Sequence, residues 1–339
     1  MSIRLGNLTL DPPVFLAPLA GITDLPFREL VARFGAGLVV SEMIASQDLL
    51  NAKPGVREKA ELGFGIEGTA VQIAGCEAHW MAEAARFAEA SGAKIIDINM
   101  GCPAKKVTSS SGAGASGSAL LRDLDHALSL IEAVVGAVDV PVTLKTRLGW
   151  DDALLNAPEL AVRAEAAGIQ MITIHGRTRC QFYKGAADWR AIRRVKDSVR
   201  IPVIANGDIV DTCTARTALE QSGADGVMLG RGVQGRPWMP ALVASDLFGS
   251  KAPNIPQDDD FIAMVSYHYE AILKFYGNDL GVRVARKHLG WYMDHLGTEK
   301  TIRNQILTCK TSEETFALLP DMLCQAHDGV KAIDGRAAA

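Results

Sequence analysis

The sequence has 339 residues, of which 48% are hydrophobic, 22% are charged and 6% are aromatic. A chain this apolar is not intrinsically disordered, and a core of this size needs no disulfide or metal to stabilise it. At about 150 residues per domain, the length predicts two domains, or one large α/β barrel with an appendage. The formal net charge of −4 does not by itself favour a nucleic-acid partner.

Targeting and metal-binding signals are not evident in the sequence. Residues 1–13 lack the long apolar stretch of a signal peptide, and no run approaches the roughly 20 apolar residues of a membrane helix. The six cysteines are scattered without a C-x-x-C pair, so their spacing predicts neither a zinc site nor a disulfide framework. We therefore expect a cytoplasmic protein with no metal and no membrane partner, in which a cysteine is by default a small buried side chain.

Short apolar runs rich in Val and Ile predict eight buried β-strands. In chain order they are Val14–Pro18, Leu38–Glu42, Thr69–Ile73, Ile95–Asn99, Val142–Lys145, Met171–His175, Val203–Asn206 and Gly226–Gly230. Segments rich in Ala, Glu, Arg and Leu lie between most of them and predict helices, several of which end at a glycine. This alternation predicts an α/β fold with parallel strands, and eight units in about 240 residues favour a (β/α)8 TIM barrel. A doubly wound sheet is the alternative.

The pattern changes after the expected barrel, residues 1–245. Residues 246–260 contain two prolines and three consecutive aspartates and are typical of a linker. Residues 261–335 show no strand pattern, and we expect helices at Phe261–Tyr276, at Gly281–Leu296 and in the Thr311–Val330 region. The sequence therefore predicts a second, helical C-terminal domain.

The carboxyl ends of the predicted strands are unusually polar, and in a barrel these ends form the active site. The loops after strands seven and eight contain Asn206-Gly207-Asp208 and Gly230-Arg231-Gly232. Glycine lets backbone N–H groups approach a phosphate, and a guanidinium can bind one through two hydrogen bonds. Both loops together indicate a phosphate site, although either loop alone could be a tight turn.

Three side chains on the buried strands have two interpretations each. Lys145 is either part of an ion pair or a cation beside an electron-rich cofactor ring. His175 is either a core histidine or a hydrogen-bond donor to a substrate or cofactor carbonyl. Gln72 either fills the barrel or bonds the amide edge of a ring, since it offers both a donor and an acceptor.

Cys102 differs from the other cysteines because it lies in a Gly-Cys-Pro turn at a strand end, close to Asn99. A free cysteine is mostly a thiol at neutral pH, which suits a proton donor better than a nucleophile. Nearby Lys105 and Lys106 could change that balance, and simple packing at the barrel rim is the alternative.

Six motifs together resemble one known family. They are APLAGITDLPFR from Ala17, INMGCPAKKV from Ile98, VTLKTRLGW from Val142, ITIHGRTR from Ile172, IANGDI from Ile204 and GVMLGRG from Gly226. In order and spacing, along nearly the whole chain, the sequence resembles the bacterial tRNA-dihydrouridine synthases, in particular the DusB/NifR3-like branch. The resemblance implies an FMN-binding barrel, a helical tRNA-binding domain, and reduction of tRNA uridines to 5,6-dihydrouridine with NADPH as reductant.

The resemblance also implies roles for individual residues. Cys102 would give a proton to C5 of the uracil while C6 receives a hydride. FMN would contact Ala17, Pro18, Leu19, Gln72, Lys145, His175, Asn206, Gly207, Asp208, Gly230 and Arg231. The substrate would contact Asn99 and Arg177, and in the tail Arg283, Arg286 and Lys287. Two departures from the family pattern are the segment Thr108–Ser116, which is a few residues longer, and Leu19 in place of the usual Met. We expect a monomer.

Two other functions remain open at this point. One is an FMN-dependent TIM-barrel dehydrogenase that acts on a small pyrimidine-like molecule and would not need a basic tail. The other is a non-catalytic RNA-binding protein, which would tolerate Cys102→Ala. The net charge does not exclude tRNA, because basic residues gather near the barrel mouth and on one tail helix while acidic residues are spread elsewhere.

Overall fold

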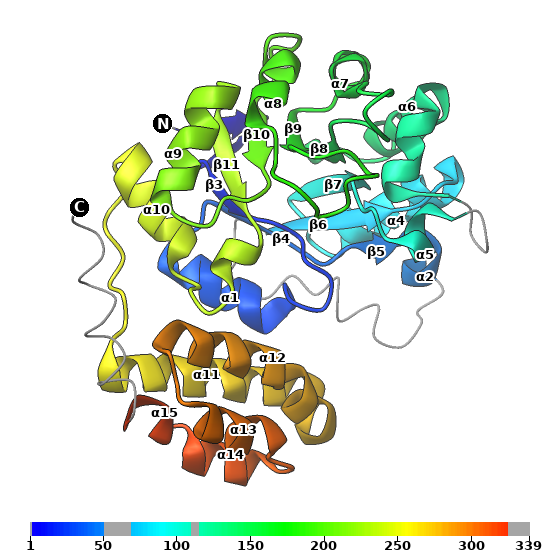
Figure 1. Cartoon of the computed structure of the whole chain (residues 1–339). Coiled ribbons are helices and arrows are strands. Elements are labelled where there is room, and N and C mark those ends of the chain that lie inside the picture. Colours follow the sequence, from blue (N-terminus) through cyan, green and yellow to red (C-terminus); the bar gives the residue numbers. More distant parts are fainter. Residues whose placement is uncertain (1, 51–68, 110–114, 325–339) are drawn as a thin grey trace. The chain divides into compact units, whose positions relative to one another are not determined.

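The computed structural model describes residues 2–50, 69–109 and 115–324 (Figure 1). The chain divides into two compact units. The first consists of Met1–Gly232 with Met239–Ala252, and the second of Val233–Trp238 with Pro253–Ala339. Each unit is described by itself below.

The first unit is a closed barrel of eight parallel strands. They are β3 (Val14–Leu16), β4 (Leu38–Val40), β6 (Thr69–Ala74), β7 (Ile95–Met100), β8 (Val142–Arg147), β9 (Met171–His175), β10 (Val203–Asn206) and β11 (Gly226–Leu229). Each strand pairs with the next, β11 pairs with β3, and the β4–β6 pairing completes the ring. A short strand, β5 (Ile44–Ala45), also pairs with β6. The predicted TIM barrel is therefore confirmed, and every predicted strand lies in it.

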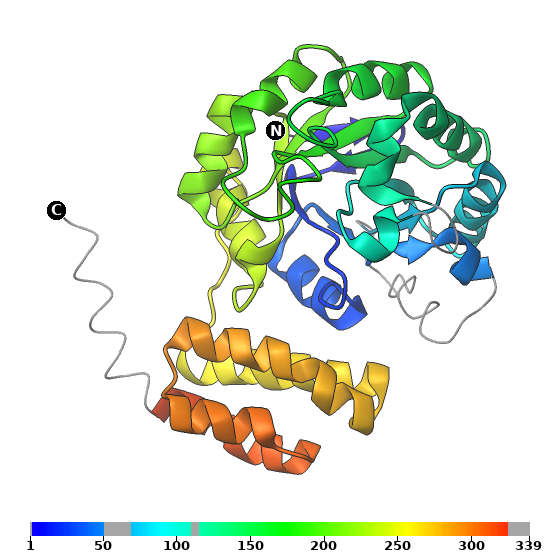
Figure 2. The same cartoon turned by 45° about the vertical axis from the view of Figure 1, so that its right-hand side comes forward.

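Helices surround this barrel (Figure 2). The longer ones are α1 (Leu25–Phe34), α4 (Ala78–Ala90), α6 (Leu124–Val135), α7 (Ala157–Ala166), α8 (Trp189–Lys196), α9 (Thr212–Ser222) and α10 (Met239–Phe248), and the shorter ones are α2 (Ser46–Leu50), α5 (Lys105–Thr108), η1 (Gly117–Arg122) and η2 (Arg231–Val233). Local sequence sets several of their ends. The Asp211 carboxylate caps the first turn of α9 by accepting from the Thr214 N–H, and Gly223 ends that helix in the left-handed conformation.

The barrel interior is apolar at its amino-terminal end. Phe15, Leu38, Ile95, Met171, Ile204 and Met228 form one buried cluster from different strands. A hairpin that the sequence analysis missed, β1 (Ile3–Leu5) and β2 (Leu8–Leu10), adds Leu5 and Leu10 to this cluster. Because apolar side chains fill this end, the polar side chains of the strands are left for the opposite, carboxyl end.

The second unit is helical in its described residues. It contains α11 (Asp258–Tyr276), α12 (Asn278–Leu296), α13 (Lys300–Thr308), α14 (Ser312–Leu318) and α15 (Asp321–Cys324). Phe261 of α11 packs edge-on against Tyr292 of α12. The first two predicted helices are present, but α13 was not predicted, and residues 325–330 of the last predicted region lie outside the described residues.

The segment expected as a linker, residues 246–260, is shorter in the structure. Helix α10 continues to Phe248 and α11 begins at Asp258, which leaves residues 249–257 between them. The three aspartates therefore belong to the first turn of α11. Negative side chains are favourable there because the N-terminus of a helix carries partial positive charge. Within the described ranges, no helix has the length and apolar character that would let it cross a membrane.

Candidate active site

The predicted barrel residues gather at the carboxyl ends of the strands. Gln72, Lys145, His175 and Asn206 lie on β6, β8, β9 and β10. Strand register places Lys145 beside Asn99, and His175 between Arg147 and Asn206. Asn99 lies on β7, and the segments directly after strands β3, β7, β9, β10 and β11 contain the remaining ones: Ala17, Pro18, Leu19, Cys102, Arg177, Gly207, Asp208, Gly230 and Arg231.

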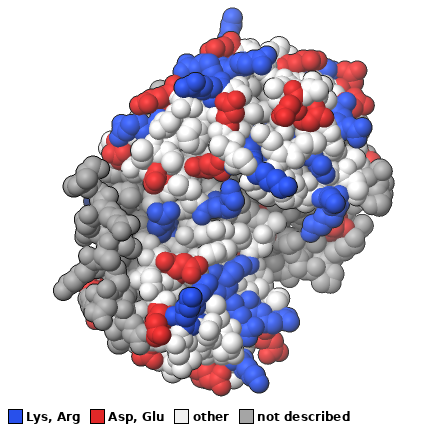
Figure 3. Space-filling model, viewed as in Figure 1, with Lys and Arg blue, Asp and Glu red and all other residues white. Residues whose placement is uncertain are grey.

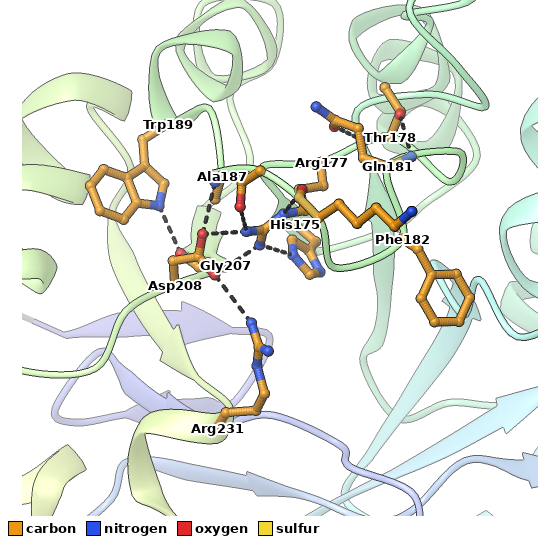
Figure 4. Close-up of polar contacts among 12 residues, drawn as sticks. His175, Arg177, Thr178, Gln181, Phe182, Ala187, Trp189, Gly207, Asp208 and Arg231 are labelled. Carbon is orange, nitrogen blue, oxygen red and sulfur yellow. Dashed lines mark hydrogen bonds and ion pairs between the residues drawn. The ribbon is translucent and has the colours of Figure 1, made fainter.

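Arg177 forms a buried ion pair with Asp208 (Figure 4). Only 2% of its side chain is exposed, and both Nη atoms donate to the Asp208 carboxylate, at 2.8 and 2.5 Å. It also donates to the carbonyls of Lys184 and Gly185. Partial burial would raise the pKa of Asp208, but the hydrogen bonds and charge of Arg177, with the Ala187 N–H, lower it. The structure thus gives Arg177, expected to face the substrate, a set of internal partners.

Arg231 is the exposed cation beside this pair, with 55% of its side chain accessible. Its Nη2 lies 3.3 Å from Asp208 Oδ1, and its guanidinium lies over the ring of Tyr183. Arg147 lies over the same ring. Asp208 itself is a carboxylate, so it is poorly suited to touch a phosphate directly. Its contact with Arg231 instead holds a guanidinium where a phosphate could be bound.

Gly207 has no room for a side chain. Its φ is +109°, and a Cβ added there would lie 2.8 Å from Cδ2 of His175. The indole N–H of Trp189 donates to its carbonyl at 2.9 Å (Figure 4). Gly230 is different, because a Cβ there would meet only Leu19 and Ala17, at ordinary contact distances of 3.7 and 3.8 Å. The first glycine lets the histidine pack close, whereas the second leaves an open side along the backbone.

Lys145, which is buried, and His175, which is half-buried, are two basic groups with lowered pKa values. Burial, reinforced by the charges of Arg147, Lys145 and Arg177, lowers the pKa of His175 well below its ordinary range, so its imidazole is neutral at pH 7. Burial lowers the pKa of Lys145 to about 8, and the charge of Asp97 opposes that shift. Lys145 Nζ donates to Oδ1 of Asn206 at 2.9 Å, which connects β8 to β10 over the intervening strand β9, and the ammonium group is still largely cationic at neutral pH.

The turn that contains Cys102 is held by three side chains. Asn99 Oδ1 accepts from the N–H groups of Gly101 and Cys102, at 3.2 and 3.0 Å. The Ser118 hydroxyl donates to the Cys102 carbonyl at 2.8 Å, and Arg147 Nε donates to the Gly101 carbonyl at 2.8 Å. Cys102 is half-buried. These contacts fix the backbone that presents the thiol at this end of the barrel.

Sequence reasoning missed three residues of this site. Arg147 ends strand β8 and is 1% exposed, and its polar position at a strand end was a usable signal. Asp97 is buried on β7, where it accepts from Gln72 and Thr143. Tyr183 lies in the loop between β9 and α8, and nothing in the local sequence marks its position between two arginines.

The default expectation of burial was wrong for Cys180 and Cys213, which are both exposed.

The three tail residues belong to α12 in the second unit. Arg283 is exposed, whereas Arg286 and Lys287 are half-buried. Arg286 Nη2 donates to the Cys309 carbonyl at 3.0 Å and so connects α12 to the end of α13. Figure 3 shows Lys and Arg side chains gathered on the visible face of the helical unit. Their roles in binding remain predictions, and Arg286 has a structural contact as well.

The barrel end suits an anionic, planar cofactor such as FMN. Lys145 provides a buried cation and Arg231 an exposed one, and Gly230 leaves its side of the backbone open. Among the described residues, no group of three or more His, Cys, Asp or Glu side chains is arranged so that it could hold a metal ion.

Comparison with known proteins agrees with this geometry. The sequence model of the family described as dihydrouridine synthase (Dus) matches residues 15–327. The chain belongs to the dihydrouridine synthase family. A protein of Rhodobacter capsulatus called "Probable tRNA-dihydrouridine synthase" is 62% identical over 94% of this chain and 97% of its own length. "tRNA-dihydrouridine synthase B" of Pseudomonas putida is 43% identical over 100% of this chain and 99% of its own length.

Two solved structures that match the fold are much less similar in sequence than these dihydrouridine synthases. A complex of 2-naphthoyl-CoA reductase with 2-naphthoyl-CoA matches with a TM-score of 0.56 and 15% identity, over 72% of this chain and 52% of that one. Histamine dehydrogenase from Rhizobium sp. 4-9 matches with a TM-score of 0.55 and 13% identity, over 79% and 50%. The chain thus spans about half the length of these two proteins, and the likeness concerns the fold alone.

Proposed function

We propose that this chain reduces uridines in tRNA to 5,6-dihydrouridine, with FMN as its bound flavin and NADPH as reductant. The observation that carries the proposal is the Cys102 turn, which lies at the same end of the barrel as the cation Lys145 and the neutral His175. Family membership and the names of the relatives support the same activity. The protein would act as a monomer in the cytoplasm, without a metal.

The barrel residues would bind the phosphate group of the cofactor at one place and its ring at another. Arg231, beside the open backbone of Gly230, would take the phosphate. Lys145, which Asn206 holds in place, would put positive charge beside the ring and stabilise negative charge there. FMN held in this way and reduced by NADPH would supply a hydride for C6 of the uracil.

Side chains of the protein would then bind the substrate base and protonate it. A uridine inside folded tRNA is stacked, so it must be turned out of the stack to enter the barrel end. Neutral His175 can donate one hydrogen bond to a carbonyl of the flavin or of the uracil without adding a charge. The Cys102 thiol would give its proton to C5, and the exposed cation Arg283 of the helical unit would bind tRNA phosphate.

The test is to assay the purified protein with NADPH and an unmodified tRNA transcript, and to quantify dihydrouridine in the digested RNA. We expect flavin to be released on heating and dihydrouridine to accumulate. Cys102→Ala should retain flavin but lose about 10²–10⁴-fold in rate, the usual contribution of a general acid. Cys213→Ala, at an exposed cysteine on α9, is the matched control and should react normally.

Three outcomes would count against the proposal. Protein without flavin would remove the redox chemistry. Equal rates for Cys102→Ala and the control would remove the role of the thiol. Reduction of free uracil or uridine with no reaction on tRNA would instead support the small-molecule dehydrogenase.

A further inference from the structure

A chain of buried hydrogen bonds connects Asp97 to the turn of Cys102. Gln72 Nε2 donates to Asp97 Oδ2 at 2.7 Å, and Asn99 Nδ2 donates to Gln72 Oε1 at 2.8 Å. Asn99 Oδ1 then accepts from the N–H groups of Gly101 and Cys102. The three side chains come from adjacent strands β6 and β7 and are at most 7% exposed.

The direction of this chain follows from the group at its inner end. A carboxylate can only accept hydrogen bonds, so Gln72 must turn its NH₂ group toward Asp97. The Gln72 oxygen then faces Asn99, so Asn99 must turn its own NH₂ group toward Gln72. The Asn99 oxygen is therefore left for the two backbone N–H groups of the turn, which need an acceptor.

The direction is kept when Asp97 is ionised and also when it is protonated on Oδ1. Its other oxygen, Oδ1, meets the Thr143 hydroxyl at 2.6 Å, and a hydroxyl can accept as well as donate. A proton on Oδ1 would therefore be donated to Thr143, and Oδ2 would still accept from Gln72. If the direction were reversed, the Asn99 NH₂ group would face the two part-buried backbone donors, and a fully buried N–H left unpaired costs about 1–3 kcal/mol, which is the upper limit for each.

We propose that Asp97 is a positioning residue for this reaction: through Gln72 it fixes the orientation of the Asn99 amide, and thereby the backbone that presents the Cys102 thiol. Asp97 touches neither the thiol nor its backbone, so it acts only through other residues. The inference rests on the proposed function, in which Cys102 provides the proton for C5. It identifies a buried carboxyl as the part of the barrel that keeps the acid in place.

The substitution Asp97→Leu removes the acceptor and keeps a side chain of similar size. Two variants serve as controls. Asp97→Asn can keep its oxygen toward Gln72 and turn its NH₂ group to the Thr143 hydroxyl, so the direction of the chain is preserved. Thr143→Val removes the other hydrogen bond of Asp97, which is equally buried, and leaves the hydrogen bonds among Asp97, Gln72 and Asn99 in place.

Each variant is assayed as the flavin-loaded protein in two half-reactions. Reduction of the flavin by NADPH, followed by its absorbance, does not involve the Cys102 proton. Reoxidation of the reduced protein by tRNA in a single turnover does involve it. We expect Asp97→Leu to slow reoxidation about 10²-fold, the usual cost of misplacing a reacting group by about 1 Å, with NADPH reduction within about threefold of normal. Both controls should stay within about threefold in both half-reactions.

The presentation of the thiol is measured separately. Alkylation of Cys102 by iodoacetamide is followed by peptide mass spectrometry, with exposed Cys213 as the internal control. In Asp97→Leu, the Cys102 rate should change by more than threefold relative to Cys213, and in the two controls it should not.

The outcomes separate this inference from the function on which it rests. Normal reoxidation and normal Cys102 alkylation in Asp97→Leu would overturn the positioning role, as would equal losses in Thr143→Val. If Asp97→Leu does not fold, Asp97→Ser is measured instead, since its hydroxyl can donate or accept and cannot impose a direction. Failure of the unsubstituted protein to reduce tRNA would refute the proposed function and leave the alkylation result interpretable.

Discussion

The ion pair of Arg177 with Asp208 leads to a quantitative prediction. Arg177→Met keeps the length of the side chain and removes the guanidinium. Five hydrogen bonds disappear, two of them to Asp208, one each to the carbonyls of Lys184 and Gly185, and a longer one of 3.4 Å to Nε2 of the neutral His175 ring. Because the arginine is only 2% exposed, water cannot replace it fully at these acceptors. The variant should therefore destabilise the barrel rather than affect the substrate alone.

The size of the effect follows from the burial of the pair. Removing one partner of a buried ion pair typically costs about 3–5 kcal/mol. Asp208 is itself 29% exposed and keeps its contact with Arg231, so we expect the lower end, about 3 kcal/mol. For a unit of this size, each kcal/mol lowers the melting temperature by about 2–4 °C, which gives a fall of about 6–12 °C.

The assay is thermal unfolding of the flavin-loaded protein, with Arg193→Met as the matched control. Arg193 also donates to two carbonyls, those of Glu220 and Gln221, but it is exposed, so its loss should cost less than about 1 kcal/mol.

The pKa of Asp208 is lowered in the folded barrel, so the stability that this group contributes is present above about pH 4 and is lost as the pH falls further. The difference between Arg177→Met and the unsubstituted protein should shrink over that range.

Two results would refute this reasoning. One is a melting temperature for Arg177→Met equal to that of the control. The other is an unchanged melting temperature together with a raised KM for tRNA, which would make Arg177 a substrate contact without a structural role.

Three further predictions concern other parts of the site. An anionic ligand favours the protonated form of Lys145, whose pKa is about 8. FMN should therefore bind about tenfold more weakly at pH 9 than at pH 7 in a fluorescence titration, and Lys145→Met should not show this pH dependence. Gly207→Ala should lower the melting temperature and the flavin content, since its φ of +109° and its contact with His175 cost about 1–3 kcal/mol in strain; an unaffected variant would contradict the contact. Arg283→Ala should weaken tRNA binding and reduce its salt dependence by about one phosphate contact, without affecting unfolding. Arg286→Met should instead lower the melting temperature of the helical unit. If the two variants behave identically, the distinction between a binding and a structural arginine is wrong.

Local patterns in the sequence were sufficient for the barrel. Runs such as Val14–Leu16 are apolar on both faces because both faces of a parallel strand are covered, and the glycines between helix and strand mark the turns. Such signals lie within a few residues of one another and do not depend on the rest of the chain. The β1–β2 hairpin and helix α13 were missed because they are short and their apolar residues are too few to show a period.

The sequence by itself also determined which end of the barrel is chemically active, since the order of the chain decides which residues follow each strand. Only the tertiary structure decided how those residues pair. Arg177 meets Asp208 from 31 positions away, and Asn99 meets Gln72 from 27 positions away. Those contacts depend on the register of neighbouring parallel strands and on the closure of the ring, which brings together residues that no local pattern relates. For that reason the sequence did not reveal the internal partners of Arg177, whose substrate contact stays a prediction from the family resemblance, and Asp97 was overlooked.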